Sequence, residues 1–178
     1  AKLASLLAKT LGQSDDACET IDLAARLHDI GKVGIPDSLM QKPQPLSEGE
    51  RQILQTHAAT GADLLSKTKV SYGELASDIA RHHHERWDGN GYPEGISGSA
   101  IPLPARIVCL CDSYDALTHE KAYRRAFSSD EAISEILRLR ELQFDPHCIF
   151  DRRRLGAVPA AEAAGHPPHA ATAVSSHH

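Results

Sequence analysis

Apolar side chains recur along most of this chain every three or four residues, the spacing that one face of an α-helix requires. Helix starts are marked by Ser14 and by two Ser-x-x-Glu sequences, Ser47–Glu50 and Ser128–Glu131, which form capping boxes. No segment alternates between apolar and polar residues as a half-buried strand does, so the pattern predicts an all-α fold. The predicted helices span about residues 1–12, 14–30, 47–65, 74–84, 105–115, 128–142 and 145–154.

Spacing within the predicted helices also indicates which side chains face the core. His57 falls three and four positions after Leu54 and Ile53, so we expect it to share their inward face. Four leucines form the predicted apolar face of the first helix: Leu3, Leu6, Leu7 and Leu11.

The segment 85–101 is rich in glycine and has no helical pattern, and long loops in compact domains are usually functional or mobile. Residues 1–155 form one predicted domain. Its first helix begins abruptly, without an initiator methionine, as expected for a piece of a longer protein. Residues 156–178 consist mainly of Ala, Pro, His and Ser and lack the apolar content to pack, so we expect a disordered tail.

The composition limits the classes of function. With 19 basic and 24 acidic residues, the 178-residue chain carries a formal charge of -5, which argues against a nucleic-acid polymer as partner. A small anionic substrate stays open, because bound cations would dominate the local field. The chain has no apolar run of membrane-spanning length and no signal peptide, and its four cysteines form no C-x-x-C pair. Buried, reduced thiols and a cytoplasmic location are therefore expected.

Six polar side chains occupy otherwise apolar helical settings. An ionised carboxylate in such a setting is costly unless it is paired or bound to metal. Histidine and carboxylate ligands without a thiolate favour Fe, Mn or Zn, and six ligands are too many for one tetrahedral zinc. The set therefore predicts a two-metal site bridged by Asp29. The six residues are His28, Asp29, His57, His83, His84 and Asp112.

Each of these residues has another interpretation when it is taken alone. His28 could cap its helix, and His57 could be a core histidine with its hydrogen bonds satisfied. Asp112 could pair with Arg106 or Arg124. The metal hypothesis is stronger for the whole set, because it explains all six residues at once.

The order of these residues resembles the HD superfamily of metal-dependent phosphohydrolases, and within it the HD-GYP family. The resemblance is carried by the run Leu27–Asp37, by His57, and by the run His83–Pro93, which ends in Gly-Tyr-Pro. It continues through Ile101–Leu103 to Tyr123-Arg124 and covers about residues 1–150. A bare His-Asp pair would be a weak signal, whereas the full string in this order is very specific.

The resemblance implies an all-α, HD-type helical bundle with the Gly-rich loop at the metal site. It implies two or three divalent metal ions, often iron or manganese, and hydrolysis of cyclic di-GMP to linear pGpG or to GMP in bacterial second-messenger signalling. By position, the six residues above would be the metal ligands, and Lys32 and Asp29 would be catalytic. The residues implied in substrate binding are Lys121, Arg124, Gly91, Tyr92 and Pro93.

This chain departs from the family pattern at two places. Family members usually carry a further ligand histidine on the first helix, and residues 1–12 contain none, so we expect two metals. The usual Arg-Pro-Tyr reads Lys121-Ala122-Tyr123, which keeps the charge but changes the geometry of the cation and the stiffness of the loop.

Two rival functions remain from the sequence. The first is a catalytically impaired interaction module, in which the loop 85–101 binds a cyclic di-GMP synthase or another signalling protein. The second is an HD hydrolase of a different cyclic dinucleotide. A homodimer is also compatible with the sequence.

Overall fold

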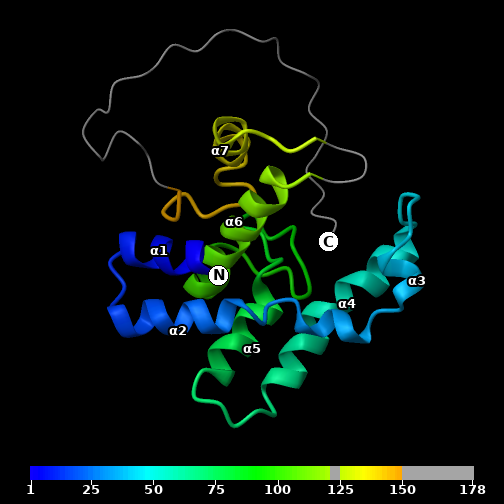
Figure 1. The fold of residues 1–178 in the computed structure, drawn as a ribbon, viewed down its shortest axis with the longest axis horizontal. Helices are drawn as coiled ribbons and strands as arrows, with labels where there is room; N and C mark the ends of the chain where they lie inside the picture. The colour runs from blue at the N-terminus through cyan, green and yellow to red at the C-terminus, as the bar shows by residue number, and fades with distance from the viewer. Residues whose placement is uncertain (121–124, 150–178) are drawn as a thin grey trace, which may run out of the picture.

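The computed structural model describes residues 1–120 and 125–149, and these residues form a bundle of helices (Figure 1). The predicted all-α fold is confirmed: the described residues contain no strand, and their one β-bridge joins Arg140 to Phe144. The predicted tail at 156–178 lies outside the described residues. The α-helices are α1 (Lys2–Thr10), α2 (Asp15–Ala25), α3 (Asp37–Met40), α4 (Glu48–Leu65), α5 (Gly73–His82), α6 (Leu103–Thr118) and α7 (Ser129–Arg138), with 3-10 helices η1 (Ile30–Gly34) and η2 (Gly98–Ala100).

The three predicted helix starts are confirmed by their caps. The Ser14 side chain accepts a hydrogen bond from the amide of Ala17, at the start of α2. Ser47 with Glu50 and Ser128 with Glu131 form complete capping boxes at the starts of α4 and α7. Each box satisfies two backbone donors that a helix start leaves without a partner, which explains why α4 and α7 begin where they do.

Helix α5 packs against three other helices, α2, α4 and α6, and lies below α2 in the view of Figure 1. Alanines dominate the contacts of α1, α2 and α5: Ala4, Ala8, Ala24, Ala76 and Ala80 are at most 1% exposed. Small side chains let helix backbones approach closely, so α1, α2 and α5 pack tightly against their neighbours. A second apolar cluster joins α6 to α7 and the turn after it.

The predicted apolar face of α1 is partly wrong. Leu3 and Leu6 are 42% and 62% exposed, whereas Ala4 and Ala8 are buried. The helix therefore rests on its alanine face, which fits closely against α2 and α6. A similar correction applies to α4, where Leu54 is buried as predicted but Ile53 is 49% exposed.

Two predicted helices end earlier than their apolar patterns indicated. Helix α2 ends at Ala25, and His28 and Asp29 lie in the turn before η1 rather than on the helix. Helix α7 ends at Arg138, and soon afterwards Glu141 adopts a φ of 67°, which an α-helix cannot contain. The helix predicted from Asp145 is absent from residues 145–149, which form a turn.

None of the helices in residues 1–120 and 125–149 combines the length and the apolar character that a bilayer span requires.

Candidate metal centre

Four of the six predicted ligands form one compact group. A ligand atom from each of Asp29, His57, His83 and His84 lies within 4.8 Å of the others. Asp29 directly precedes η1, His57 lies in the middle of α4, and His83 and His84 follow the last residue of α5. The sequence therefore brings three separate segments to one point, as predicted.

Close contact between η1 and α4 places Asp29 beside His57. A side chain on Gly31 would overlap the backbone carbonyl of His57 and the amide of Gly61. Two glycines at this contact therefore let the turn lie directly on the helix backbone. As a result, the Oδ1 atom of Asp29 lies 3.4 Å from the Nε2 atom of His57.

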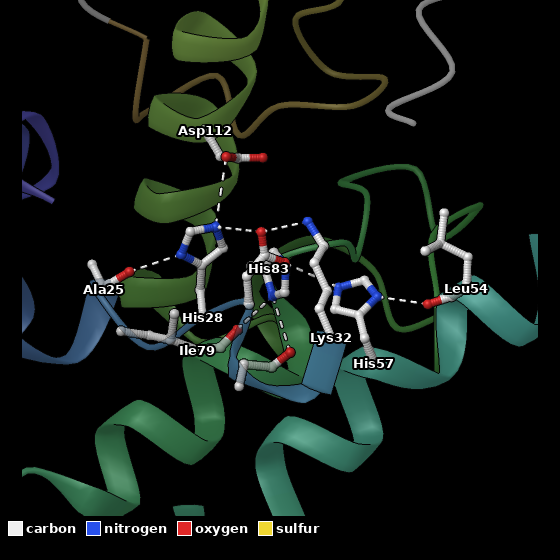
Figure 2. A network of polar contacts seen from close by, with 10 residues as sticks. Ala25, His28, Lys32, Leu54, His57, Ile79, His83 and Asp112 are labelled. Carbon is white, nitrogen blue, oxygen red and sulfur yellow. Dashed lines mark hydrogen bonds and ion pairs between the residues drawn. The ribbon is translucent and has the colours of Figure 1, made fainter. Parts of the chain in front are cut away.

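The two remaining predicted ligands, His28 and Asp112, contact each other, and His28 also contacts Asp29 (Figure 2). The Nε2 atom of His28 is 3.4 Å from Asp29 Oδ2 and 3.6 Å from Asp112 Oδ1. Asp112 comes from α6, so a fourth segment joins the centre. Asp29 thus faces His57 and His83 through Oδ1 and His28 through Oδ2, the arrangement expected of a bridging carboxylate.

Backbone carbonyls hold three of the histidine rings (Figure 2). The Nδ1 atoms of His28, His57 and His83 lie 2.8, 2.7 and 2.9 Å from the carbonyl oxygens of Ala25, Leu54 and Ala80. A carbonyl only accepts hydrogen bonds, so each Nδ1 carries the proton. In His57 and His83 this leaves Nε2 with the free lone pair that a metal ion binds, whereas His28 Nε2 already faces Asp29 and Asp112.

His84 is held differently. Among the described residues, its ring has no backbone carbonyl as a hydrogen-bond partner, and instead the Tyr92 ring stacks on it. The ring centroids are 4.7 Å apart, with an interplanar angle of 23°. Tyr92 belongs to the predicted Gly91-Tyr92-Pro93 loop, so this loop directly contacts one of the predicted metal ligands.

Buried polar atoms without hydrogen bonds indicate that the centre fits a cation. Among the described residues, Asp29 Oδ1, His57 Nε2 and His83 Nε2 are buried and accept or donate no hydrogen bond. Such atoms are costly unless another partner satisfies them. All three belong to the compact group, and imidazole with carboxylate is a donor set suited to divalent Fe, Mn or Zn.

Electrostatics favour metal-binding protonation states at His57, His84 and Asp29, but not at His28. Burial lowers the pKa of His57, and it lowers that of His84 well below its usual range, so both imidazoles are neutral. For Asp29, burial opposes ionisation, but the neighbouring His28 and His83 rings and the Lys32 ammonium outweigh it and lower the pKa. For His28, burial is outweighed by Asp112 and Asp29, which raise its pKa to about 10, so its ring is protonated at neutral pH and would have to lose a proton to bind a metal ion.

Lys32 lies at the centre rather than on the surface. Its Nζ atom donates a hydrogen bond to Asp29 Oδ2 at 2.6 Å, and its side chain is 19% exposed (Figure 2). The alternative pairing of Asp112 with Arg106 is wrong, because Arg106 forms its ion pair with Asp145. Lys121 and Arg124, expected to bind substrate, lie outside the described residues.

One buried residue beside the centre, Glu85, was not singled out from the sequence. Glu85 is 2% exposed, and its Oε1 atom accepts hydrogen bonds from the amides of Glu94 and Gly95. Its position could have been noticed, since it directly follows the predicted ligands His83 and His84 and opens the Gly-rich loop. The cysteine prediction is confirmed: all four are free and buried.

Comparison with known proteins agrees with this geometry. The HD domain family model matches residues 1–148. The chain is 42% identical over 147 residues to the cyclic di-GMP phosphodiesterase response regulator RpfG of Xanthomonas campestris pv. campestris, covering 83% of this chain and 39% of that protein. It is 35% identical over 143 residues to the 3'3'-cGAMP-specific phosphodiesterase 2 of Vibrio cholerae, covering 80% and 27%.

A solved structure, Bd1817, a HDG"Y"P protein from Bdellovibrio bacteriovorus, has the same fold, with a TM-score of 0.63 and 22% identity over 82% of this chain and 46% of that one. The chain spans less than half the length of these proteins. The matched family, the described fold and the Gly-Tyr-Pro loop beside the histidine cluster together place this chain in the HD domain family, in its HD-GYP group.

Proposed function

We propose that this chain is a metal-dependent phosphodiesterase domain that hydrolyses cyclic di-GMP to pGpG, to GMP or to both. The observation that carries the proposal is the convergence of six ligand-type side chains, Asp29 and five others. Three buried atoms of this set have no hydrogen-bond partner among the described residues. The name of the relative from Xanthomonas campestris supports cyclic di-GMP as the substrate.

In this proposal the centre would hold two divalent ions, iron or manganese. Asp29, His57, His83 and His84 would hold the first, and His28, Asp112 and Asp29 would hold the other. Divalent ions bound there would supply Lewis acidity toward a phosphodiester and lower the pKa of a bound water. The second group offers three protein ligands against four, so we expect its ion to bind more weakly.

Lys32 is the proposed proton donor to the leaving ribose oxygen. Its ammonium group already lies 2.6 Å from Asp29, which directs it at the centre. A general acid placed in this way contributes about 100-fold or more to a rate. Lys121 and Arg124 are the proposed phosphate contacts, and Gly91, Tyr92 and Pro93 form the proposed side of the site that meets the nucleotide.

A second cyclic dinucleotide is a specific alternative. The relative from Vibrio cholerae named as specific for 3'3'-cGAMP is 35% identical to this chain. Both substrates present the same phosphodiester and differ in one base, so the metal centre alone does not distinguish them. Base recognition would come from groups around the centre.

The test is turnover by the chain purified without oxygen and loaded with Fe(II) or Mn(II), with products separated by chromatography. Cyclic di-GMP and 3'3'-cGAMP are supplied in parallel. We expect linear and mononucleotide products from cyclic di-GMP, and their loss in Asp29→Asn and His57→Ala. A metal-loaded chain that hydrolyses neither compound would contradict the proposal, and a preference for 3'3'-cGAMP would favour the alternative substrate.

A further inference from the structure

The loop after the ligand histidines folds back on its own beginning. The Tyr92 amide donates to the His84 carbonyl at 3.3 Å, and the Gly98 amide donates to the Trp87 carbonyl at 3.0 Å. A side chain on Gly91 would lie 2.6 Å from the His84 carbonyl oxygen, so only glycine fits at this crossing. The crossing brings Tyr92 back over the start of the loop.

Glu85 occupies the interior of this loop. Its Oε1 atom lies 2.7 Å from the amide of Glu94 and 3.1 Å from that of Gly95, the residues that directly follow Tyr92 and Pro93. Its Oε2 atom has no hydrogen-bond partner among the described residues. Glu85 therefore holds the far arm of the loop, residues 94–95, through one oxygen.

The arm that Glu85 holds directly follows Tyr92 and Pro93, and the ring of Tyr92 stacks on the predicted ligand His84. His28, His57 and His83 are each oriented by a backbone carbonyl, whereas His84 is oriented by its stack on Tyr92. A displacement of this arm would therefore release the His84 ring, which no backbone carbonyl holds among the described residues. Glu85 is not itself in the compact ligand group.

We propose that Glu85 is a positioning residue for the metal centre: it fixes the loop that holds Tyr92 against His84, and so sets the orientation of the fourth imidazole. The inference rests on the proposed metal-binding function. It predicts that Glu85 variants weaken metal binding through Tyr92, although Glu85 touches neither metal nor substrate.

Two readouts test this without any nucleotide. Trp87 is the only tryptophan of the chain and lies inside the loop, so its fluorescence reports the loop conformation. Titration of the chelator-stripped chain with Mn(II), followed by the electron paramagnetic resonance signal of the free ion, gives metal affinity. We expect Glu85→Leu to shift Trp87 emission and to weaken Mn(II) binding by about 10–100-fold, the usual effect of losing a residue that orients a metal ligand.

Glu85→Gln keeps the shape and one acceptor oxygen, so it should fall between the wild type and Glu85→Leu, and it carries the test if the leucine variant does not fold. The matched control is Glu50→Gln, the same change at a capping carboxylate that also accepts a backbone hydrogen bond, on the start of α4. This control should leave Trp87 emission and Mn(II) affinity at their wild-type values.

A double-mutant cycle separates positioning from general destabilisation. Tyr92→Leu alone should weaken Mn(II) binding, and adding Glu85→Gln to it should cause little further loss, because Glu85 acts through Tyr92. Additive losses, or Glu85 variants with wild-type emission and affinity, would overturn the proposal. Since no nucleotide is present, failure to hydrolyse cyclic di-GMP would count against the proposed function alone.

Discussion

The Nε2 atom of His57 lies 3.4 Å from the Oδ1 atom of Asp29, and neither atom has a hydrogen-bond partner among the described residues. Two buried polar atoms that face each other unsatisfied are a poor way to stabilise a fold. The pair is better explained as half of a ligand group preserved for a cation. In the proposed centre, the other oxygen of Asp29 would belong to the second ligand group, which includes His28 and Asp112. The two halves of the centre, which are the two ligand groups, would therefore share one side chain.

The two halves should bind metal unequally. His57→Ala removes a ligand from the four-residue group, and His28→Ala removes one from the three-residue group. We expect the His28 variant to retain roughly one equivalent of tightly bound metal where the wild type binds roughly two, and the His57 variant to lose the tight equivalent. Elemental analysis after dialysis measures both. Equal losses in the two variants would contradict separate halves.

Lys32 should contribute through its proton as well as its charge. Lys32→Met removes both and should lower kcat by about 100-fold, with metal content unchanged. Lys32→Arg keeps the positive charge, but a guanidinium does not release its proton near neutral pH. If proton donation matters, the arginine variant will be nearly as slow as the methionine variant. Recovery of most of kcat in Lys32→Arg would show that charge alone suffices.

The sequence predicted the members of the site better than their surroundings. Metal ligands must be particular residue types, so His28, Asp29 and Asp112 stand out in apolar runs without any knowledge of the fold. The role of Gly31 could not be found in this way, because it depends on which backbone crosses it. The same holds for α1, where the buried side is set by close packing of alanines and not by the largest apolar residues.

Gly31→Ala should destabilise the fold and the centre together. The added methyl group would overlap backbone atoms of α4, which cannot move as a flexible side chain does. We expect a loss of about 1–3 kcal/mol or more in the free energy of unfolding, measured with urea, together with weaker metal binding.

The matched control for this change is Gly49→Ala, in the first turn of α4, where an added Cβ meets nothing within 4 Å. Alanine is the better helix former, so this variant should be as stable as the wild type, or up to about 1 kcal/mol more stable. Equal effects of the two substitutions would contradict the close contact between η1 and α4.

Acid should remove the contribution of the capping box at the start of α4. The ammonium of Lys42, followed by hydrogen bonds from Ser47, lowers the pKa of Glu50 to about 2, from an ordinary value of 4.5. A lowered folded-state pKa means that the carboxylate stabilises the fold above about pH 4.5, and that this contribution disappears as the pH falls toward 2. The difference in unfolding free energy between the wild type and Glu50→Gln should therefore be largest near neutral pH and shrink at about pH 3. Glu131→Gln provides a replicate, because Arg125 likewise holds the pKa of Glu131 at about 2.

Urea unfolding at several pH values measures both differences in unfolding free energy. A difference that stays constant between neutral pH and about pH 3 would show that the ionised carboxylate is not what stabilises the cap.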